Sequence, residues 1–78
     1  MQEFSIRIRS FQEIQDFIQL ATAQPFRVQV SNDHQLANAT SFMALVSLDH
    51  SRPVRVSAQC DEQLFRSFRL QAARFAAE

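Results

Sequence analysis

The chain has 78 residues, with eight arginines and no lysine against eight acidic residues, so its formal net charge is zero. This length predicts one domain over residues 1–78, and an apolar content of 46% argues against disorder. The lack of a basic excess argues against nucleic-acid binding, and the lack of glycine excludes both the P-loop and the glycine-rich dinucleotide fingerprint.

The N-terminal part of the chain predicts a strand followed by a helix. Phe4, Ile6 and Ile8 alternate with polar residues, as in a half-buried strand. Ser10 and Glu13 then form a capping box, which predicts a helix start. The helix is expected over 11–23, with an apolar face formed by Phe11, Ile14, Phe17, Ile18 and Ala21. No continuous apolar stretch is present here, so we predict neither a signal peptide nor a membrane span.

The middle of the chain predicts a hairpin and a short helix. Alternating residues indicate a second strand over 26–30 and a weaker return strand over 35–39. Asn32-Asp33 between them is typical of a turn. Because there is no glycine, we expect Asn, Asp or His to supply any positive φ, and His34 is such a glycine substitute. A short apolar helix is predicted over 41–48.

The C-terminal part predicts a fourth strand, over 54–58, and a last helix capped by Asp61. The expected apolar face of that helix is Leu64, Phe65, Phe68, Ala72 and Phe75. Each strand has one apolar face, so helices should cover only one side of the sheet. The predicted fold is α+β, a two-layer open-faced sandwich of order β-α-β-β-α-β-α. Its open face is expected to carry four arginines, either as a solvated surface or as a site for an acidic partner: Arg7, Arg9, Arg27 and Arg55.

Two segments carry the pattern of a known family. Residues 38–48 read NATSFMALVSL, and residues 54–63 read VRVSAQCDEQ. They resemble the N-A-K-S-I-M-x-V-M-S-L and I-T-I-S-A-E-G-x-D-E patterns of HPr, the phosphocarrier of the bacterial sugar phosphotransferase system. The resemblance implies an HPr-like open-faced β-sandwich with a four-stranded antiparallel sheet and three helices, which agrees with the element order read from periodicity.

The N-terminal third departs from that family. HPr proteins carry G-L-H-x-R-P before the first helix, and their histidine accepts phosphate from Enzyme I. This chain passes from Arg9 directly to Ser10, which places Ser10 at the histidine position and Gln12 at the arginine position. A relay needs an imidazole nitrogen as nucleophile. We therefore expect neither an enzyme nor a cofactor, and interpret Ser10 as a helix cap.

Ser41 aligns with the serine that HPr kinase phosphorylates in part of the family. A phosphate at a helix N-terminus meets free N–H groups, which supports a regulatory role there. The adjacent Phe42, Met43 and Val46 are candidate contacts for a protein partner, such as HPr kinase or a transcriptional regulator in catabolite regulation. The alternative is that Ser41 is only a cap and that the apolar residues belong to the core.

The two histidines and the cysteine have simpler explanations as well as functional ones. His50 is expected in a loop beside the relay site, where it is a candidate substitute phosphoacceptor, as His34 is in the hairpin. Cys60 is interpreted as a turn residue, with a lowered pKa as the alternative. No Cys/His spacing predicts a metal site. The single cysteine agrees with a cytoplasmic location. A regulatory protein, a carrier using another histidine and a structural module all remain open.

Overall fold

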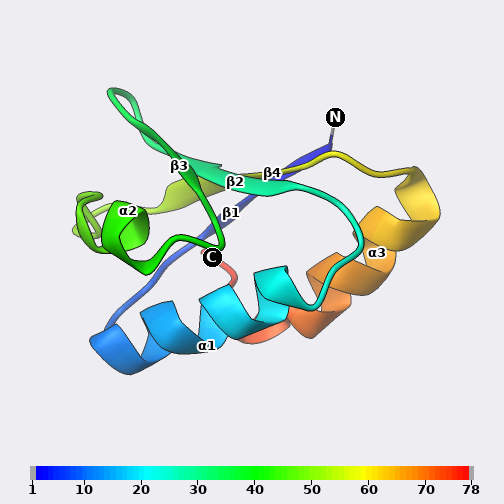
Figure 1. Ribbon diagram of the computed structural model, residues 1–78, viewed down its shortest axis with the longest axis horizontal. Coiled ribbons are helices and arrows are strands. Elements are labelled where there is room, and N and C mark those ends of the chain that lie inside the picture. The colour runs from blue at the N-terminus through cyan, green and yellow to red at the C-terminus, as the bar shows by residue number, and fades with distance from the viewer. Residues whose placement is uncertain (1, 78) are drawn as a thin grey trace.

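A computed structural model describes residues 2–77 of the chain. Its sheet is antiparallel, with strand order β1-β4-β2-β3. Helices α1 and α3 lie side by side on one side of the sheet, and α2 lies at the end near β3 (Figure 1). The elements in chain order are β1 (Gln2–Ile6), α1 (Phe11–Thr22), β2 (Val28–Ser31), β3 (Leu36–Asn38), α2 (Phe42–Val46), β4 (Val54–Ala58), α3 (Glu62–Gln71) and the 3₁₀ turn η1 (Ala73–Phe75). The predicted fold class and element order are confirmed.

Aromatic side chains form much of the core between the sheet and the helices. Phe68 of α3 is fully buried, and its ring meets those of Phe4, Phe17 and Phe26 at centroid distances of 5.7, 6.4 and 5.6 Å. Phe75 packs edge-on against Phe17 at 5.4 Å. These contacts join β1, both long helices and the segment before β2. A chain without tryptophan thus obtains its core volume from phenylalanine.

The predicted first strand is too long. Its pairing with β4 ends at Ile6–Val54, because Pro53 comes next and has no N–H for the ladder. Ile8 is nevertheless buried, as its alternation predicted. Beyond Ile6, the chain pairs with the C-terminal segment: the Arg7 N–H donates to the Phe75 carbonyl at 2.8 Å.

The predicted last helix is in fact two elements. Helix α3 ends at Gln71, and η1 then carries Phe75 into the core. Leu64 is exposed although it was expected on the apolar face, because the first turn of α3 extends past the sheet (Figure 1). Leu36 of β3 is also exposed, since its neighbours Ala37 and Ala39 face the core.

The prediction that His34 replaces a glycine at positive φ is wrong. Within residues 2–77, no residue has positive φ. The side-chain oxygen of Asn32 accepts the N–H groups of His34 and Gln35 at 2.9 and 2.7 Å, and the Asn32 N–H donates to the Gln35 carbonyl. This Asx turn closes the hairpin with ordinary backbone angles.

Candidate functional site

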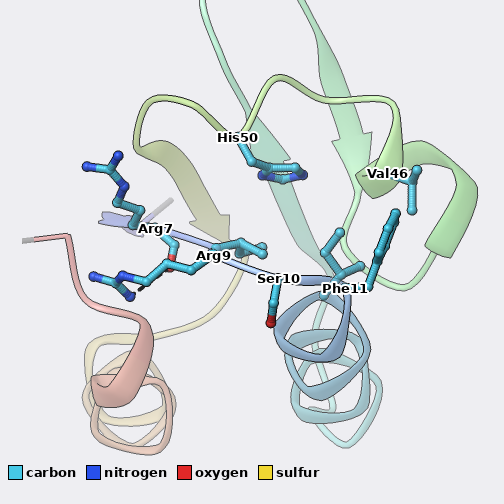
Figure 2. Close-up of a pocket in the computed structure, with 8 residues that line it drawn as sticks. Arg7, Arg9, Ser10, Phe11, Val46 and His50 are labelled. Carbon is cyan, nitrogen blue, oxygen red and sulfur yellow. Dashed lines mark hydrogen bonds between the residues drawn. The ribbon is translucent and has the colours of Figure 1, made fainter.

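A pocket of about 610 Å³ lies where the end of β1, the first turn of α1 and the loop after α2 meet (Figure 2). Its polar lining consists of Arg7, Arg9, Ser10 and His50. Its apolar lining consists of Ile8, Phe11, Ile14 and Val46. The guanidinium groups lie on one side, and Phe11 and Val46 lie on the other (Figure 2). The fold thus brings Ser10 and His50 to one site, although they lie far apart in the sequence.

Ser10 caps α1, as the sequence predicts. Its backbone is extended, and its Oγ accepts the Glu13 N–H at 3.2 Å. The Glu13 carboxylate accepts the N–H of Arg9 at 2.7 Å, one residue earlier than in the usual capping box. Both polar groups of the motif are therefore occupied in starting the helix.

The two arginines of the pocket have no acidic partner among residues 2–77. Arg7 Nη2 donates to the Ser51 carbonyl and Arg9 Nη1 to the Arg7 carbonyl, each at 3.4 Å, which is long for a hydrogen bond. Both side chains are exposed. The guanidinium groups are thus held only by weak contacts.

The expectation that four arginines lie on the open sheet face is wrong for Arg7 and Arg9. Only Arg55 lies in a strand, where its Nε is 3.9 Å from a carboxylate oxygen of Glu3. Arg27 precedes β2, and Arg7 and Arg9 follow the end of β1. Alternation predicts a residue's side of a strand only while the strand continues, and β1 stops at Ile6.

His50 joins the pocket to α2. Its Nε2 lies 2.6 Å from the Leu45 carbonyl oxygen, which can only accept, so Nε2 carries the proton. Its Nδ1 is buried and has no hydrogen-bond partner among residues 2–77. One nitrogen of the imidazole is therefore used in a hydrogen bond to α2, and the other is unpaired and closed to solvent in this conformation.

The apolar residues around α2 form a surface that continues across Phe11. We define the α1–α2 surface as Phe11, Phe42, Met43 and Val46. Phe11 is 68% exposed and Met43 73%, while Phe42 is 39% exposed and Val46 is half-buried. Phe11 was expected in the core, but the first turn of α1 lies beyond β1, where no strand covers it. Its helical spacing gave no sign of this.

Ser41 is the N-cap of α2. Its half-buried Oγ lies 3.4 Å from the Ala44 N–H that it accepts. Asp61 caps α3 with a shorter contact, 2.8 Å to the Leu64 N–H. The cap predicted at Ser41 is confirmed, but its hydrogen bond is weak.

Two further groups, the Cys60 thiol and the Asp49 carboxyl, have shifted pKa values. Partial burial and the neighbouring Asp61 raise the pKa of the Cys60 thiol, against the lowered value considered from sequence. Hydrogen bonds from Ser51, through its hydroxyl and its N–H, lower the pKa of Asp49. Across residues 2–77, no group of three or more His, Cys, Asp or Glu side chains could hold a metal ion. His34 lies apart from the pocket, in the hairpin.

Comparison with solved structures identifies the fold family. HPr-C-His from Thermoanaerobacter tengcongensis superposes with a TM-score of 0.74 and 25% sequence identity, over 95% of this chain and 92% of that one. The histidine-containing phosphocarrier protein of Mycoplasma superposes with a TM-score of 0.66 and 11% identity, over 97% and 100% of the two chains. No protein-family model matches the sequence, and no curated protein sequence matches it.

The chain has an HPr-like fold. The 25% identity to HPr-C-His over nearly the whole chain agrees with the patterns at residues 38–48 and 54–63. The described helices include none that is long and apolar enough to cross a membrane.

Proposed function

We propose that this HPr-like protein acts through contacts with a protein partner and does not carry phosphate at the N-terminus of α1. The observation that carries the proposal is the state of Ser10, which occupies that position as a helix cap. Its hydroxyl has a high pKa and its lone pair already accepts the Glu13 N–H. A phosphocarrier needs a free nucleophile there, so transfer to this group is disfavoured. We expect the protein to work in the cytoplasm and not as an enzyme.

The α1–α2 surface is the proposed contact for the partner. Exposed aromatic and methionine side chains gather there, and such residues are enriched at protein interfaces. Arg7 and Arg9 lie beside Phe11 at the same pocket, and they would favour a partner with acidic residues at its rim. HPr kinase and a transcriptional regulator are the partner classes that the resemblance implies.

Phosphorylation of Ser41 is the proposed regulation of this contact. The hydroxyl stands at the start of α2, directly before Phe42 and Met43. A phosphate there would meet N–H groups of the first turn and would place two negative charges at the edge of the α1–α2 surface. A part in catabolite regulation follows if the modified form binds a transcriptional regulator.

The relay part of the proposal is tested with phosphoenolpyruvate, Enzyme I and the purified chain. We expect no label on this protein, whereas a histidine-containing HPr in the same assay becomes labelled. An acid-labile phosphoryl group on the wild-type chain would overturn the proposal.

The regulatory part is tested with HPr kinase and ATP, followed by mass spectrometry. We expect one phosphoryl group on the wild-type chain and none on Ser41→Ala. Ser47→Ala is the matched control, because Ser47 is an exposed serine at the other end of α2. Equal labelling of wild type and Ser41→Ala would contradict the proposed site.

The surface itself is tested by binding of the transcriptional regulator to the phosphorylated chain. Met43→Ser should weaken binding by at least about fivefold, which corresponds to the ~1 kcal/mol that marks the energetically important residues of an interface. Leu70→Ser is the control, because Leu70 is equally exposed but lies on α3. Similar losses in both variants would rule out a specific α1–α2 contact.

A second candidate function is phosphate transfer through His50. The unpartnered Nδ1 favours it, because His50 lines the same pocket as Arg7 and Arg9. The burial of Nδ1 opposes it, since the ring must turn before a donor reaches that atom. In the Enzyme I assay, label lost in His50→Ala but kept in His34→Ala would establish this candidate. No label in any form would remove it.

A further inference from the structure

The pocket between β1 and α1 has the composition of a small-molecule site. Its volume, about 610 Å³, lies within the roughly 300–1,000 Å³ of ligand pockets. Two guanidinium groups line one side, and Phe11 and Val46 line the other, with Ser10 and His50 between them (Figure 2). The pocket therefore offers a cationic side and an apolar side to the same ligand.

The cationic side has unused binding capacity. Arg7 and Arg9 form no ion pair within residues 2–77, and their two hydrogen bonds to carbonyl groups are both 3.4 Å long. The Glu13 carboxylate, at the start of α1, accepts the Arg9 backbone N–H and forms no ion pair with either guanidinium group. Guanidinium groups bind phosphate and carboxylate through paired hydrogen bonds. Figure 2 shows both guanidinium groups directed away from Phe11 and Val46, so the two exposed side chains would turn toward the pocket to bind an anion there.

Backbone donors add to this side of the pocket. The N–H groups of Phe11 and Gln12 are at the start of α1, where no earlier turn supplies a carbonyl, and neither has a described partner. The Ser10 cap satisfies only the Glu13 N–H. An anion bound at the start of α1, where Ser10 and Phe11 line the pocket, would meet these donors.

The apolar side defines the rest of the ligand. The exposed ring of Phe11 and the side chains of Ile14 and Val46 offer a surface about the size of one ring or a short chain. Inorganic phosphate has no apolar group, so it would leave these three side chains exposed to water. A ligand with both an oxyanion and an apolar body would cover both sides at once.

We propose that this pocket binds a small organic anion, a phosphate or carboxylate group attached to an aromatic or aliphatic body. The oxyanion lies between Arg7 and Arg9, and the apolar body lies against Phe11 and Val46. The binding is reversible and involves no covalent step. It differs from the proposed protein contact in ligand class, and it does not require Ser41 or any partner.

The test is a titration of the ¹⁵N-labelled full chain with phenyl phosphate at constant ionic strength, followed by amide chemical shifts. We expect saturable shifts confined to residues 7–14 and 46–50. Inorganic phosphate, which lacks the body, and phenol, which lacks the anion, should each bind at least about tenfold more weakly, since each keeps only one kind of contact. Benzoate in place of phenyl phosphate reports whether the pocket favours phosphate or carboxylate.

Two variants decide whether the arginines are responsible. Arg7→Gln/Arg9→Gln should weaken phenyl phosphate binding at least about tenfold, because charge-assisted hydrogen bonds are lost. Arg27→Gln is the matched control. Arg27 lies outside the pocket, is exposed, and forms no ion pair within residues 2–77. Shifts that do not saturate, or an equal loss in both variants, would overturn the proposal. Equal affinity for inorganic and phenyl phosphate would overturn it too, by showing that the apolar side is not used.

Discussion

The eight phenylalanines of this chain have very different roles, although their residue type is the same. Phe68 is fully buried among three other rings, while Phe11 is 68% exposed at the pocket. Burial determines what truncation costs, because only a buried ring leaves a cavity. The two positions therefore separate stability from binding.

Phe68→Ala should lower the free energy of unfolding by about 3–5 kcal/mol, a large share of the stability of so small a domain. Phe11→Ala should change it by less than about 0.5 kcal/mol. Urea denaturation followed by far-UV circular dichroism measures both. If the two variants lose similar stability, the core assignment of Phe68 is wrong.

Asp49 gives a prediction about pH. Its carboxylate accepts hydrogen bonds from Ser51, so its pKa in the folded state lies below the usual value of 3.8. A lowered pKa means that the charged form stabilises the fold at pH above the unfolded value, and this contribution is lost as the pH falls through the lowered value.

We expect an NMR titration of the Asp49 side chain to show its midpoint below 3.8, and Ser51→Ala to move it upward. Ser67→Ala is the control, because Ser67 is an exposed serine on α3, and it should leave the Asp49 midpoint unchanged. If the Asp49 midpoint is the same in the wild-type chain and in Ser51→Ala, these hydrogen bonds do not form in solution.

At the scale of elements, one ion pair adds to the apolar contact between α1 and η1 that Phe17 and Phe75 form. Arg74 Nη2 lies 3.0 Å from a carboxylate oxygen of Asp16, and the Asp16 side chain is 27% exposed. The pair Arg66–Glu62 on α3 is longer, 3.3 Å, and its two side chains are about three-quarters exposed. Solvent screens the second pair more strongly.

Double-mutant cycles with Asp16→Asn and Arg74→Gln should give a coupling of ~0.5–1 kcal/mol. The cycle with Glu62→Gln and Arg66→Gln should give only ~0.3 kcal/mol. Thermal unfolding of the four variants of each cycle provides the values. A larger coupling for the α3 pair would contradict the arrangement of α1 and η1.

The elements also show how far the sequence predicts the structure. Periodicity and caps located the α-helices and the strands but not η1, because Ser10, Ser41 and Asp61 each mark a helix start through residues close to them in sequence. The ends were less certain, since Ile8 leaves the sheet when its partner strand meets Pro53. The residues next to Ile8 in sequence do not indicate where β4, the partner strand of β1, begins.

The pocket was only partly predictable for the same reason. Ser10 and His50 were each singled out, but Arg7 and Arg9 were expected on the sheet face and Phe11 in the core. Their true positions depend on where β1 ends relative to α1 and the loop after α2. That relation is set by tertiary packing and not by the spacing of side chains.

At the scale of the whole molecule, one core connects the sheet and the helices. Buried residues from all four strands and from α1, α2 and α3 belong to one apolar cluster. The C-terminal segment is tied to β1 by hydrogen bonds from Arg7 N–H to Phe75 and from Ala77 N–H to Ser5. Local loss of one element therefore exposes the core of the others.

We therefore expect the chain to unfold as one domain in a single cooperative transition. Far-UV circular dichroism and the NMR methyl signals of Val56 and Leu45 should give the same urea midpoint, one from the sheet and one from α2. Separate midpoints for these signals would show that α2 unfolds on its own.

The Asx turn of the hairpin and the wholly negative φ angles of residues 2–77 have a consequence for the denatured chain. Glycine loses more backbone entropy on folding than any other residue, by an amount equivalent to about 0.4–1 kcal/mol per position. A chain that closes its turns without glycine starts from a narrower unfolded ensemble. The chain therefore loses less backbone conformational entropy when it folds. This smaller loss partly compensates for the limited apolar burial of a domain of 78 residues.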